Sequence, residues 1–366
     1  MKRKIIHIVY SLGYGGLEQV IVNLINNSTH YNVEHCIITL TGEHELYKTI
    51  IPKVEIYNLN KKPGKDILVY WKLFKHLKKI KADVIHSYNF GTIEYHLIAK
   101  IAGIKTRVHC EHGRGGDDPD GLDFWHNIVR RIAIIFIHQF IVVSPDLLVW
   151  GKKVLKLKKN KIRVIFNGVN LDEYQPSHNK NTHYTICTVG RANPIKNQRL
   201  LIDAFALLVE QYPEYKQHQL QIVGGGSLLE ELTSQVKDRQ LEDQITLLGY
   251  KNNVATIMGQ ANLFVLSSIY EAMPMTILEA MACELPVITT DVGGVGHMVS
   301  NNEVWLVESN NVEILAGTIH QVYSYQKTSE AKGKRGRAYV EKNYSIEKMV
   351  SQYMSLYQCS IIKPVV

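Results

Sequence analysis

Short runs of apolar, largely β-branched residues alternate with longer stretches of helical periodicity along most of the chain. KIIHIVY precedes a helical stretch over 15–27, and ADVIHS precedes another over 92–102. Strands that are apolar throughout are typical of parallel sheets covered by helices on both faces. The alternation therefore predicts an α/β fold. Further predicted strands are VEHCIITL, VEIYNL, TRVHCE, QFIVVS, IRVIFN, YTICTVG, LQIVGGG, ITLLG, NLFVLS, PVITT and VWLVE.

A polar segment near the middle of the chain separates two such alternating sets. Residues 171–183, LDEYQPSHNKNTH, contain Pro176 and lack both the helical and the strand period, so they are interpreted as a linker. The 366 residues, 45% of them hydrophobic, suffice for two domains of ordinary size. We therefore expect a first domain over 1–171, a second over 184–345, and a C-terminal segment over 346–366 that begins as a helix.

The composition is that of a globular protein without a membrane span. The longest apolar stretch, residues 132–144, has 13 residues and includes His138 and Gln139, which makes it too short and too polar to cross a bilayer. The N-terminal MKRKIIHIVY is interpreted as a strand and not as a leader. The 5 cysteines show no metal-binding or redox spacing. A cytoplasmic location is therefore expected.

Positive charge is concentrated in the first half of the chain. Residues 1–171 contain 26 Lys and Arg against 14 acidic residues, and residues 172–366 contain 16 against 20, giving formal charges of +12 and −4. The basic runs KHLKKIK, Arg130-Arg131 and KKVLKLKKNKIR have aliphatic residues interleaved or nearby. This surface suits anionic lipid headgroups, so we expect peripheral contact with a membrane; a solvated helix face is the alternative. No nucleic-acid recognition motif accompanies the charge.

Two acidic residues stand on either side of a predicted helix start in YEAMPMTILEAMACELPV. Glu271 precedes the helix, Pro274 suits its first turn, and Glu279 lies near its second turn. A helix N-terminus favours a phosphate group, which carboxylates would repel. We therefore expect the two acids to accept hydrogen bonds from hydroxyl groups attached to bound phosphates, as in a nucleotide-sugar.

Two loops that follow predicted strands provide cations and glycines for the same ligand. Arg191 and Lys196 lie in VGRANPIKN, between a strand and a helix, where α/β folds bind ligands. They could neutralise a diphosphate leaving group. Gly224 and Gly225 lie in IVGGGSLLEEL and allow close backbone approach to a phosphate or base. A solvated arginine and a tight turn are the alternative interpretations.

Together these motifs resemble the family 4 retaining glycosyltransferases of GT-B architecture. The resemblance covers most of the chain, in order. It rests on YSLGYGGLEQVIVNL, CEHGR, VIFNGVN, VGRANPIKN, IVGGGSLLEEL and YEAMPMTILEAMACELPVITTDVGG.

The resemblance implies roles for individual residues. Arg191 and Lys196 would bind the donor diphosphate, Glu271 the hydroxyls of the transferred sugar, and Glu279 those of the ribose. His112 would lie near the sugar. The other donor-binding positions implied are Gly15, Gly16, Gly224, Gly225, Met273, Pro274, Met275 and Thr276.

The resemblance also implies an architecture and an activity. Two Rossmann-like domains would face each other across a cleft, the first binding the acceptor and the second the donor, with the C-terminal helix crossing back to the first domain. The reaction would transfer a sugar with retention from a nucleotide-sugar, expected to be a UDP-sugar, to a glycan or lipid-linked acceptor in cell-surface polysaccharide synthesis. It would need no side-chain nucleophile, no metal and no cofactor, since the nucleotide-sugar is a substrate.

Some features depart from this pattern, and other functions remain as alternatives. The family commonly has Glu-Gly-Phe-Pro where this chain has Glu271 to Pro274, which leaves the donor sugar open, together with the acceptor, the linkage and the oligomeric state. A catalytically silent subunit with the same fold is the main alternative. An oxidoreductase is disfavoured because GYGG does not fit G-x-G-x-x-G. His109, Glu111 and His112 lack a further ligand at helical spacing, so no metal site is predicted.

Overall fold

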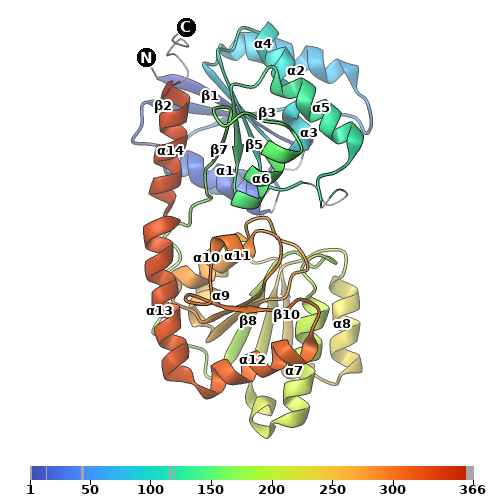
Figure 1. Cartoon of the computed structure of the whole chain (residues 1–366), viewed down its shortest axis with the longest axis vertical. Coiled ribbons are helices and arrows are strands. Elements are labelled where there is room, and N and C mark those ends of the chain that lie inside the picture. The colour runs from blue at the N-terminus through green and yellow to red at the C-terminus, as the bar shows by residue number, and fades with distance from the viewer. Residues whose placement is uncertain (1, 14, 43–44, 115–117, 119, 360–366) are drawn as a thin grey trace. The chain divides into compact units, whose positions relative to one another are not determined.

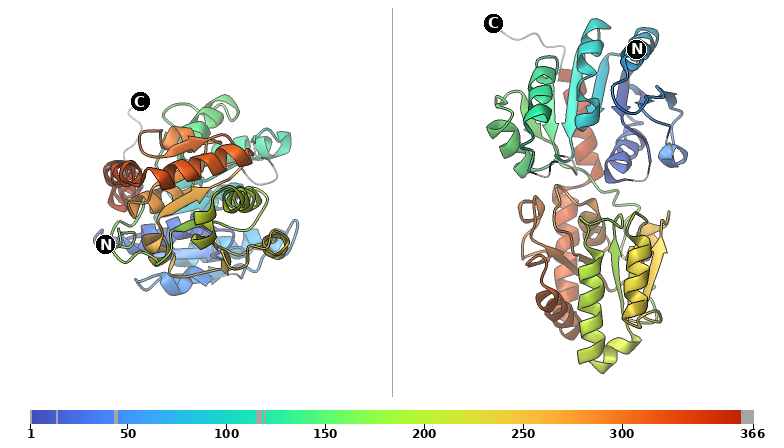
Figure 2. Two further views of the ribbon diagram at one scale, coloured as in Figure 1. Left: turned by 90° about the horizontal axis from the view of Figure 1, so that it is seen from below. Right: turned by 90° about the vertical axis from the view of Figure 1, so that its right-hand side faces the viewer.

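The computed structural model describes residues 2–13, 15–42, 45–114, 118 and 120–359, and the chain divides into two compact units. The first unit comprises Met1–Gly168 with Ile346–Val366, and the second comprises Val169–Ser345. Each unit contains one sheet with helices on both faces (Figure 1, Figure 2). All pairings between the strands named below are parallel, which confirms the predicted fold class.

The first unit has a seven-stranded sheet in the order β3-β2-β1-β4-β5-β6-β7. Its C-terminal helix α14 (Ile346–Cys359) comes from the far end of the chain. The other elements are β1 (Arg3–Val9), α1 (Gly16–Asn26), β2 (Val33–Thr39), η1 (Glu45–Thr49), β3 (Glu55–Asn58), α2 (Ile67–Ile80), β4 (Val84–Tyr88), α3 (Phe90–Ile93), α4 (His96–Ile101), β5 (Thr106–Glu111), α5 (Phe124–Ile134), β6 (Gln139–Val142), α6 (Pro145–Lys153) and β7 (Ile162–Val164).

The second unit has a six-stranded sheet in the order β10-β9-β8-β11-β12-β13. Its elements are β8 (Thr185–Val189), α7 (Gln198–Gln211), η2 (Pro213–Gln217), β9 (Gln219–Val223), α8 (Leu229–Asp238), β10 (Ile245–Gly249), α9 (Val254–Gln260), β11 (Leu263–Leu266), α10 (Met275–Ala282), β12 (Val287–Thr290), α11 (Val295–Met298), β13 (Trp305–Val307), α12 (Val312–Ser324) and α13 (Gln326–Asn343).

The predicted apolar runs form strands because both of their faces are covered. All residues of β4, β11 and β12 are buried, and so are the last five residues of β1. Local chemistry sets several helix ends. The Asp66 side chain accepts a hydrogen bond from the Leu68 N–H at the start of α2, and the Ser144 side chain accepts one from the Leu147 N–H at the start of α6.

The prediction of one continuous helix over 92–102 is wrong. The structure has two short helices, α3 and α4, separated by Glu94 and Tyr95. The Thr92 hydroxyl donates to the Tyr88 carbonyl at 2.7 Å and accepts from the Tyr88 N–H at 2.8 Å. Such side-chain bonds to the backbone compete with helix formation.

A buried ion pair on β5 corrects the expectation for one basic residue. Arg130 was expected on a basic surface, but its side chain is fully buried and its Nε donates to Glu111 Oε1 at 3.0 Å. Because a buried carboxylate needs a partner, Glu111 requires this cation. Glu111 is therefore engaged in a structural contact, and His109 Nδ1 is hydrogen-bonded to the Ser87 hydroxyl at 2.7 Å.

The face of the first sheet that α14 covers carries a buried, hydrogen-bonded network of polar side chains. His86 lies at its centre, with Nδ1 2.7 Å from the Tyr357 hydroxyl of α14. Burial lowers the pKa of His86 and His7 well below the usual value and lowers that of His35 to about 4, so these imidazoles are neutral. The other hydrogen bonds of this network are Tyr88–His86 (2.9 Å), His7–Tyr88 (2.8 Å), His7–His35 (2.9 Å) and Ser28–His35 (2.8 Å).

We expect the first unit to lose stability as the pH falls from about 6.5 towards 4. In this window the unfolded chain binds protons at these histidines that the folded unit does not bind, so acid favours unfolding. The free energy of unfolding is measured in a Trp305→Phe variant, with tryptophan fluorescence as the signal. The other tryptophans belong to the first unit, so the signal reports on that unit. A stability that stays constant between pH 7 and pH 5 would contradict the expectation.

Candidate active site

The strand order of the second sheet reverses direction between β8 and β11. Four loops lie at the carboxyl ends of the strands around this point. β9 lies on one side of β8 and β11 on the other, so the connections from these strands run in opposite directions. In open α/β sheets ligands bind at the carboxyl ends of the strands at such a switch point. The loops are 190–197 after β8, 224–228 after β9, 267–274 after β11 and 291–294 after β12.

Lys196 and Glu271 join the two loops that flank the switch point. Lys196 Nζ lies 2.5 Å from Glu271 Oε1, and the Ser268 hydroxyl donates to the same oxygen at 2.6 Å. The residue Glu271 is only 8% exposed. The Ile269 N–H also donates to the Ile195 carbonyl at 2.8 Å, so backbone and side chains connect the loops. The structure thus brings a cation and a carboxylate together in a largely buried position.

Arg191 lies in the loop after β8 and is exposed. The Gln198 side-chain amide fixes this loop by donating to the carbonyls of Gly190 and Arg191, at 3.3 and 3.2 Å. The next loop packs tightly against it. The Ala192 N–H donates to the Gly225 carbonyl at 2.8 Å, and a Cβ on Gly224 would lie 2.2 Å from the Gly190 carbonyl oxygen. Glycine at 224 is therefore required by the packing of the two loops.

Gly225 lies against a different neighbour, the exposed side chain of Tyr250. A Cβ at this position would lie 2.4 Å from the Tyr250 ring. Gly224, whose Cβ would meet backbone atoms, therefore has a structural reason independent of any ligand, whereas at Gly225 only a side chain would have to shift. The predicted role of this glycine loop in donor binding stays a prediction.

The backbone of Glu271 is held from the far side by the loop after β12. The Gly294 N–H donates to the Glu271 carbonyl at 2.7 Å. Gly293 has φ +56°, and a Cβ there would lie 2.1 Å from the same carbonyl oxygen. The Thr290 hydroxyl donates to the Ser268 carbonyl at 2.6 Å. The carboxylate is thus set in place by three neighbouring strands before any ligand arrives.

Helix α10 starts one residue later than its sequence suggests. Pro274 is the N-cap residue with extended backbone, and Met275 is the first helical residue. Met273 is buried beside them. Within the described residues, the Thr276 Oγ1 atom is buried and has no hydrogen-bond partner. A buried hydroxyl without a partner in the first turn of a helix is suited to bind an anion, together with the free N–H groups there.

Glu279 lies inside α10 and is 9% exposed. Burial raises its pKa to about 8, with a further contribution from the nearby Glu173 carboxylate, while a hydrogen bond from the Tyr174 hydroxyl opposes the rise. Arg337 Nη1 donates to the carbonyls of Tyr174 at 2.8 Å and Ala282 at 2.5 Å. Tyr174 is thereby fixed next to α10.

Three predicted site residues belong to the first unit. Gly15 is the N-cap residue of α1 and Gly16 its first residue, and a Cβ on Gly16 would meet no atom within 4 Å. His112 follows β5, and its N–H donates to Asn89 Oδ1 at 2.7 Å. Burial lowers the pKa of His112 to about 3, so the imidazole is neutral, and its buried Nε2 has no partner in the described structure.

Family models match both halves of the chain. Residues 14–173 match the model described as Glycosyltransferase Family 4, and residues 171–339 match Glycosyl transferases group 1. The chain belongs to the family 4 glycosyltransferases.

Relatives and solved structures agree with this membership. The glycosyltransferase is 27% identical over 322 residues to the Escherichia coli UDP-Gal:α-D-GlcNAc-diphosphoundecaprenol α-1,3-galactosyltransferase, covering 80% of this chain and 79% of the other. It is 25% identical to the Campylobacter jejuni N-acetylgalactosamine-N,N'-diacetylbacillosaminyl-diphospho-undecaprenol 4-α-N-acetylgalactosaminyltransferase, over 77% of this chain and 79% of the other. The crystal structure of Anabaena HepE with UDP is similar with a TM-score of 0.79, at 18% identity and over 97% and 99% of the two chains. The fold is GT-B.

Several residues of this candidate site were not singled out from the sequence of the glycosyltransferase. Ser268 and Thr290 are small polar residues at strand ends, a signal that could have drawn attention to them. Gly293 lies in the DVGG run that ends the motif YEAMPMTILEAMACELPVITTDVGG. Tyr174 lies in a segment that was interpreted as a linker, and no pattern there predicts its contact with Glu279.

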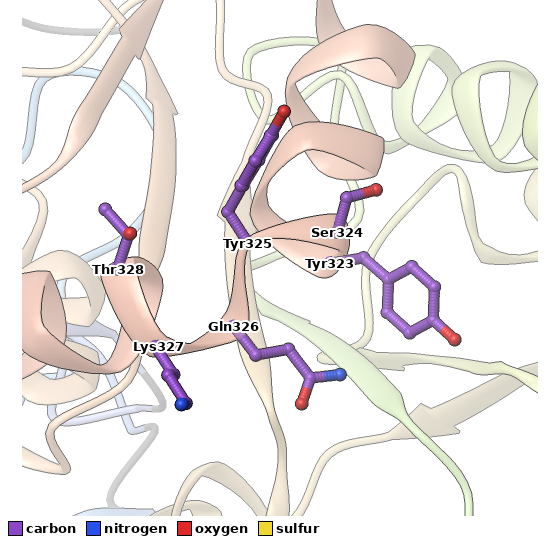
Figure 3. A pocket seen from close by; sticks show the side chains of 6 residues that line it. All are labelled: Tyr323, Ser324, Tyr325, Gln326, Lys327 and Thr328. Atoms are coloured by element: carbon purple, nitrogen blue, oxygen red, sulfur yellow. The ribbon is translucent and has the colours of Figure 1, made fainter.

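Within the described residues, a hollow elsewhere in the second unit does not coincide with the candidate site. A hollow of about 590 Å³ lies at the turn between α12 and α13, lined by Tyr323 to Thr328, and contains none of the predicted site residues (Figure 3). No group of three or more His, Cys, Asp or Glu side chains within the described ranges is arranged to hold a metal ion. Of the helices that the structure describes, none is long and apolar enough to span a bilayer.

The difference in free energy of unfolding between the Glu279→Gln variant and the wild type is expected to grow in favour of the variant as the pH rises. The raised pKa means that the folded unit holds a proton that the unfolded chain releases, so the wild type loses stability between about pH 4.5 and pH 8. The gap between variant and wild type should widen by roughly 2–4 kcal/mol from pH 5 to pH 8.5.

Urea unfolding curves at the two pH values measure this gap. Glu313→Gln is the matched control, because Glu313 is exposed in the first turn of α12. A gap of equal size at both pH values would show that Glu279 is ionised in the folded protein throughout.

Proposed function

We propose that this chain is a retaining, metal-independent glycosyltransferase that moves a sugar from a UDP-sugar to a lipid-linked glycan acceptor. The reaction would take place at the cytoplasmic face of a membrane, in the synthesis of a cell-surface polysaccharide. Family membership supports sugar transfer. UDP and a diphosphoundecaprenol-linked acceptor appear in the name of the Escherichia coli relative, and UDP is bound in the HepE structure.

The observation that carries the proposal is the Lys196–Glu271 pair at the switch point of the second sheet, beside the N-terminus of α10. A sugar diphosphate needs positive charge at its phosphates and hydrogen-bond acceptors at its hydroxyls. Lys196 and the exposed Arg191 supply the charge, and the α10 N-terminus with Thr276 Oγ1 supplies donors. Glu271 supplies an acceptor that is already oriented by Ser268.

These groups favour departure of the diphosphate. As the bond from the anomeric carbon to the phosphate oxygen breaks, negative charge grows on that oxygen, and cations fixed beside it stabilise the transition state. The acceptor hydroxyl then attacks from the same face, and its proton passes to the departing phosphate oxygen. Lys196 and Arg191 take the place of a metal ion in this scheme. Glu271 holds the sugar and is not the nucleophile.

Glu279 would bind the ribose hydroxyls. Two hydroxyl donors favour the carboxylate form, so UDP binding should lower the raised pKa of Glu279 and release its proton. Tyr174 would keep the carboxyl oriented. We assign His112 to a contact with the transferred sugar, because a neutral imidazole can exchange hydrogen bonds with a hydroxyl. Gly15 and Gly16 would contribute backbone to donor binding.

UDP is expected to stabilise the wild type, and Lys196→Ala and Glu279→Ala are expected to abolish that effect. UDP at a hundred times its dissociation constant should add about 2.7 kcal/mol to the free energy of unfolding. The measurement is the ligand-induced shift in melting temperature, for each variant relative to its own ligand-free state, with UDP, GDP, ADP and NAD.

The matched control is Arg239→Ala, which breaks an exposed ion pair with Asp203 in the same unit. It should keep the full shift. Stabilisation by NAD alone would favour an oxidoreductase, and stabilisation by none of the four would favour a catalytically silent subunit.

The product formed from a UDP-α-sugar should carry an α linkage, and the rate should be unchanged by EDTA. Retention follows from attack on the face that the phosphate leaves, and metal independence follows from the cations at positions 191 and 196. The anomeric coupling constant in the proton NMR spectrum of the product reports the stereochemistry. A β-linked product would exclude same-face attack, and inactivation by EDTA that Mg²⁺ reverses would exclude the proposed role of the two cations.

A further inference from the structure

Helix α5 has its apolar side outside and its polar side inside. The exposed fractions of Trp125, Ile132 and Ile135 are 70%, 56% and 70%, although Ile135 is the residue that caps the helix. With the partly exposed Ile128, these residues follow helical spacing along one side. We call this set the α5 stripe. The buried residues of the helix are Asn127, Arg130 and Ala133.

Contacts within the first unit explain why the polar side of α5 faces inward, but they do not cover its apolar side. A surface helix normally turns its apolar side to the core and its charged side to water. Here Arg130 faces inward because Glu111 and the Arg114 carbonyl bind its guanidinium, at 3.0 and 3.2 Å. The α5 stripe remains uncovered in the described structure. A contiguous exposed apolar surface of this kind marks a contact with another molecule or a membrane.

Cations flank the second half of the α5 stripe. Arg131 is exposed, and its Nη2 donates to the Val154 carbonyl at 2.7 Å, which places it beside the C-terminal end of α6 with exposed Lys152 and Lys153. On the other side, the Lys100 Nζ of α4 lies 5.3 Å from the Phe136 ring centroid. α5 has no acidic residue within its bounds, and the acids nearby precede its first turn.

Helix α2 repeats the pattern on the same face of the sheet. Figure 1 shows α2, α4 and α5 on the side opposite α14. The exposed fractions of Ile67, Leu68 and Trp71 are 81%, 63% and 58%. The helix contains four lysines and no acidic residue, and the Lys75 ammonium lies 3.4 Å from the centroid of the Trp71 ring. The outer layer of this face therefore combines exposed aliphatic and indole groups with positive charge.

We propose that the outer face of α2 and α5 is the surface by which this chain sits on an anionic lipid bilayer. The α5 stripe enters the boundary between headgroups and acyl chains, and the flanking lysines and arginines contact lipid phosphates. Long basic side chains can keep their charges at the headgroups while their stems lie against apolar groups. A bilayer fits better than a protein partner because cations lie beside exposed apolar groups on two helices of one face. The proposal rests on the proposed function, since a lipid-linked acceptor is presented at such a surface.

The test is flotation of the full chain with large unilamellar vesicles of phosphatidylcholine, with and without phosphatidylglycerol. The wild type should float with the anionic vesicles, less at high salt but still measurably. Ile132→Ser/Ile135→Ser should lower the partition constant about tenfold or more, because two exposed apolar side chains no longer enter the lipid. Both positions are exposed, so folding should be unaffected.

Ile51→Ser is the matched control. Ile51 is 82% exposed, and its N–H donates to Asn26 of α1 at 2.9 Å, on the other face of the sheet. This variant should bind vesicles like the wild type. Equal binding by all three proteins, or no binding by the wild type, would overturn the proposal. Wild-type self-association that the double substitution abolishes, without vesicle binding, would assign the α5 stripe to a protein interface instead.

The UDP-induced shift in melting temperature is measured in parallel. It should be the same in the wild type and in Ile132→Ser/Ile135→Ser, because neither isoleucine belongs to the donor site. If the vesicle result fails while the UDP shift persists, only the membrane surface is wrong. If the UDP shift fails while the vesicles bind, the proposed donor chemistry is wrong and the surface stands.

Discussion

The ion pair between Lys196 and Glu271 is the contact on which the candidate site depends. Each partner comes from a loop on a different side of the switch point between β8 and β11. A largely buried carboxylate is costly without a cation, so the pair holds both loops in one arrangement. The neighbouring loops then fit around them at distances that only glycine allows, at 224 and 293. The site is thus organised in advance of its ligand, which electrostatic catalysis requires.

Much of the fold could be predicted because parallel strands leave a clear signal. Buried runs such as β11 and β12 are apolar throughout, and the loops that follow strands carry the candidate residues. The orientation of α5 could not be predicted, because FWHNIVRRIAI has arginines and isoleucines at compatible spacing. The carboxylate of Glu111 on β5 decides which side faces inward. Contacts such as that of Tyr174 with Glu279 connect residues more than a hundred positions apart, which no local pattern records.

The two units respond to protons in opposite ways. In the first, neutral histidines lie beneath α14 and acid acts against folding, because burial disfavours their charged form. In the second, the buried carboxyl of Glu279 favours the protonated form, and base acts against folding. Both effects have one cause, the cost of placing an ionised group where water is excluded. The buried histidines His7, His35 and His86 therefore add no positive charge to the first unit at neutral pH.

The anchoring of Tyr174 bears on how such enzymes can be recombined. The segment after Gly168 has the composition of an inert connector, yet Arg337 ties its backbone to α10 and its phenol reaches Glu279. It therefore belongs with the second unit. A chimera that takes the first unit from one relative and the second unit from another should be joined before Val169 and again before Ile346, so that α14 stays with the sheet it covers. A first junction placed after Tyr174 would separate the tyrosine from the carboxyl that it orients.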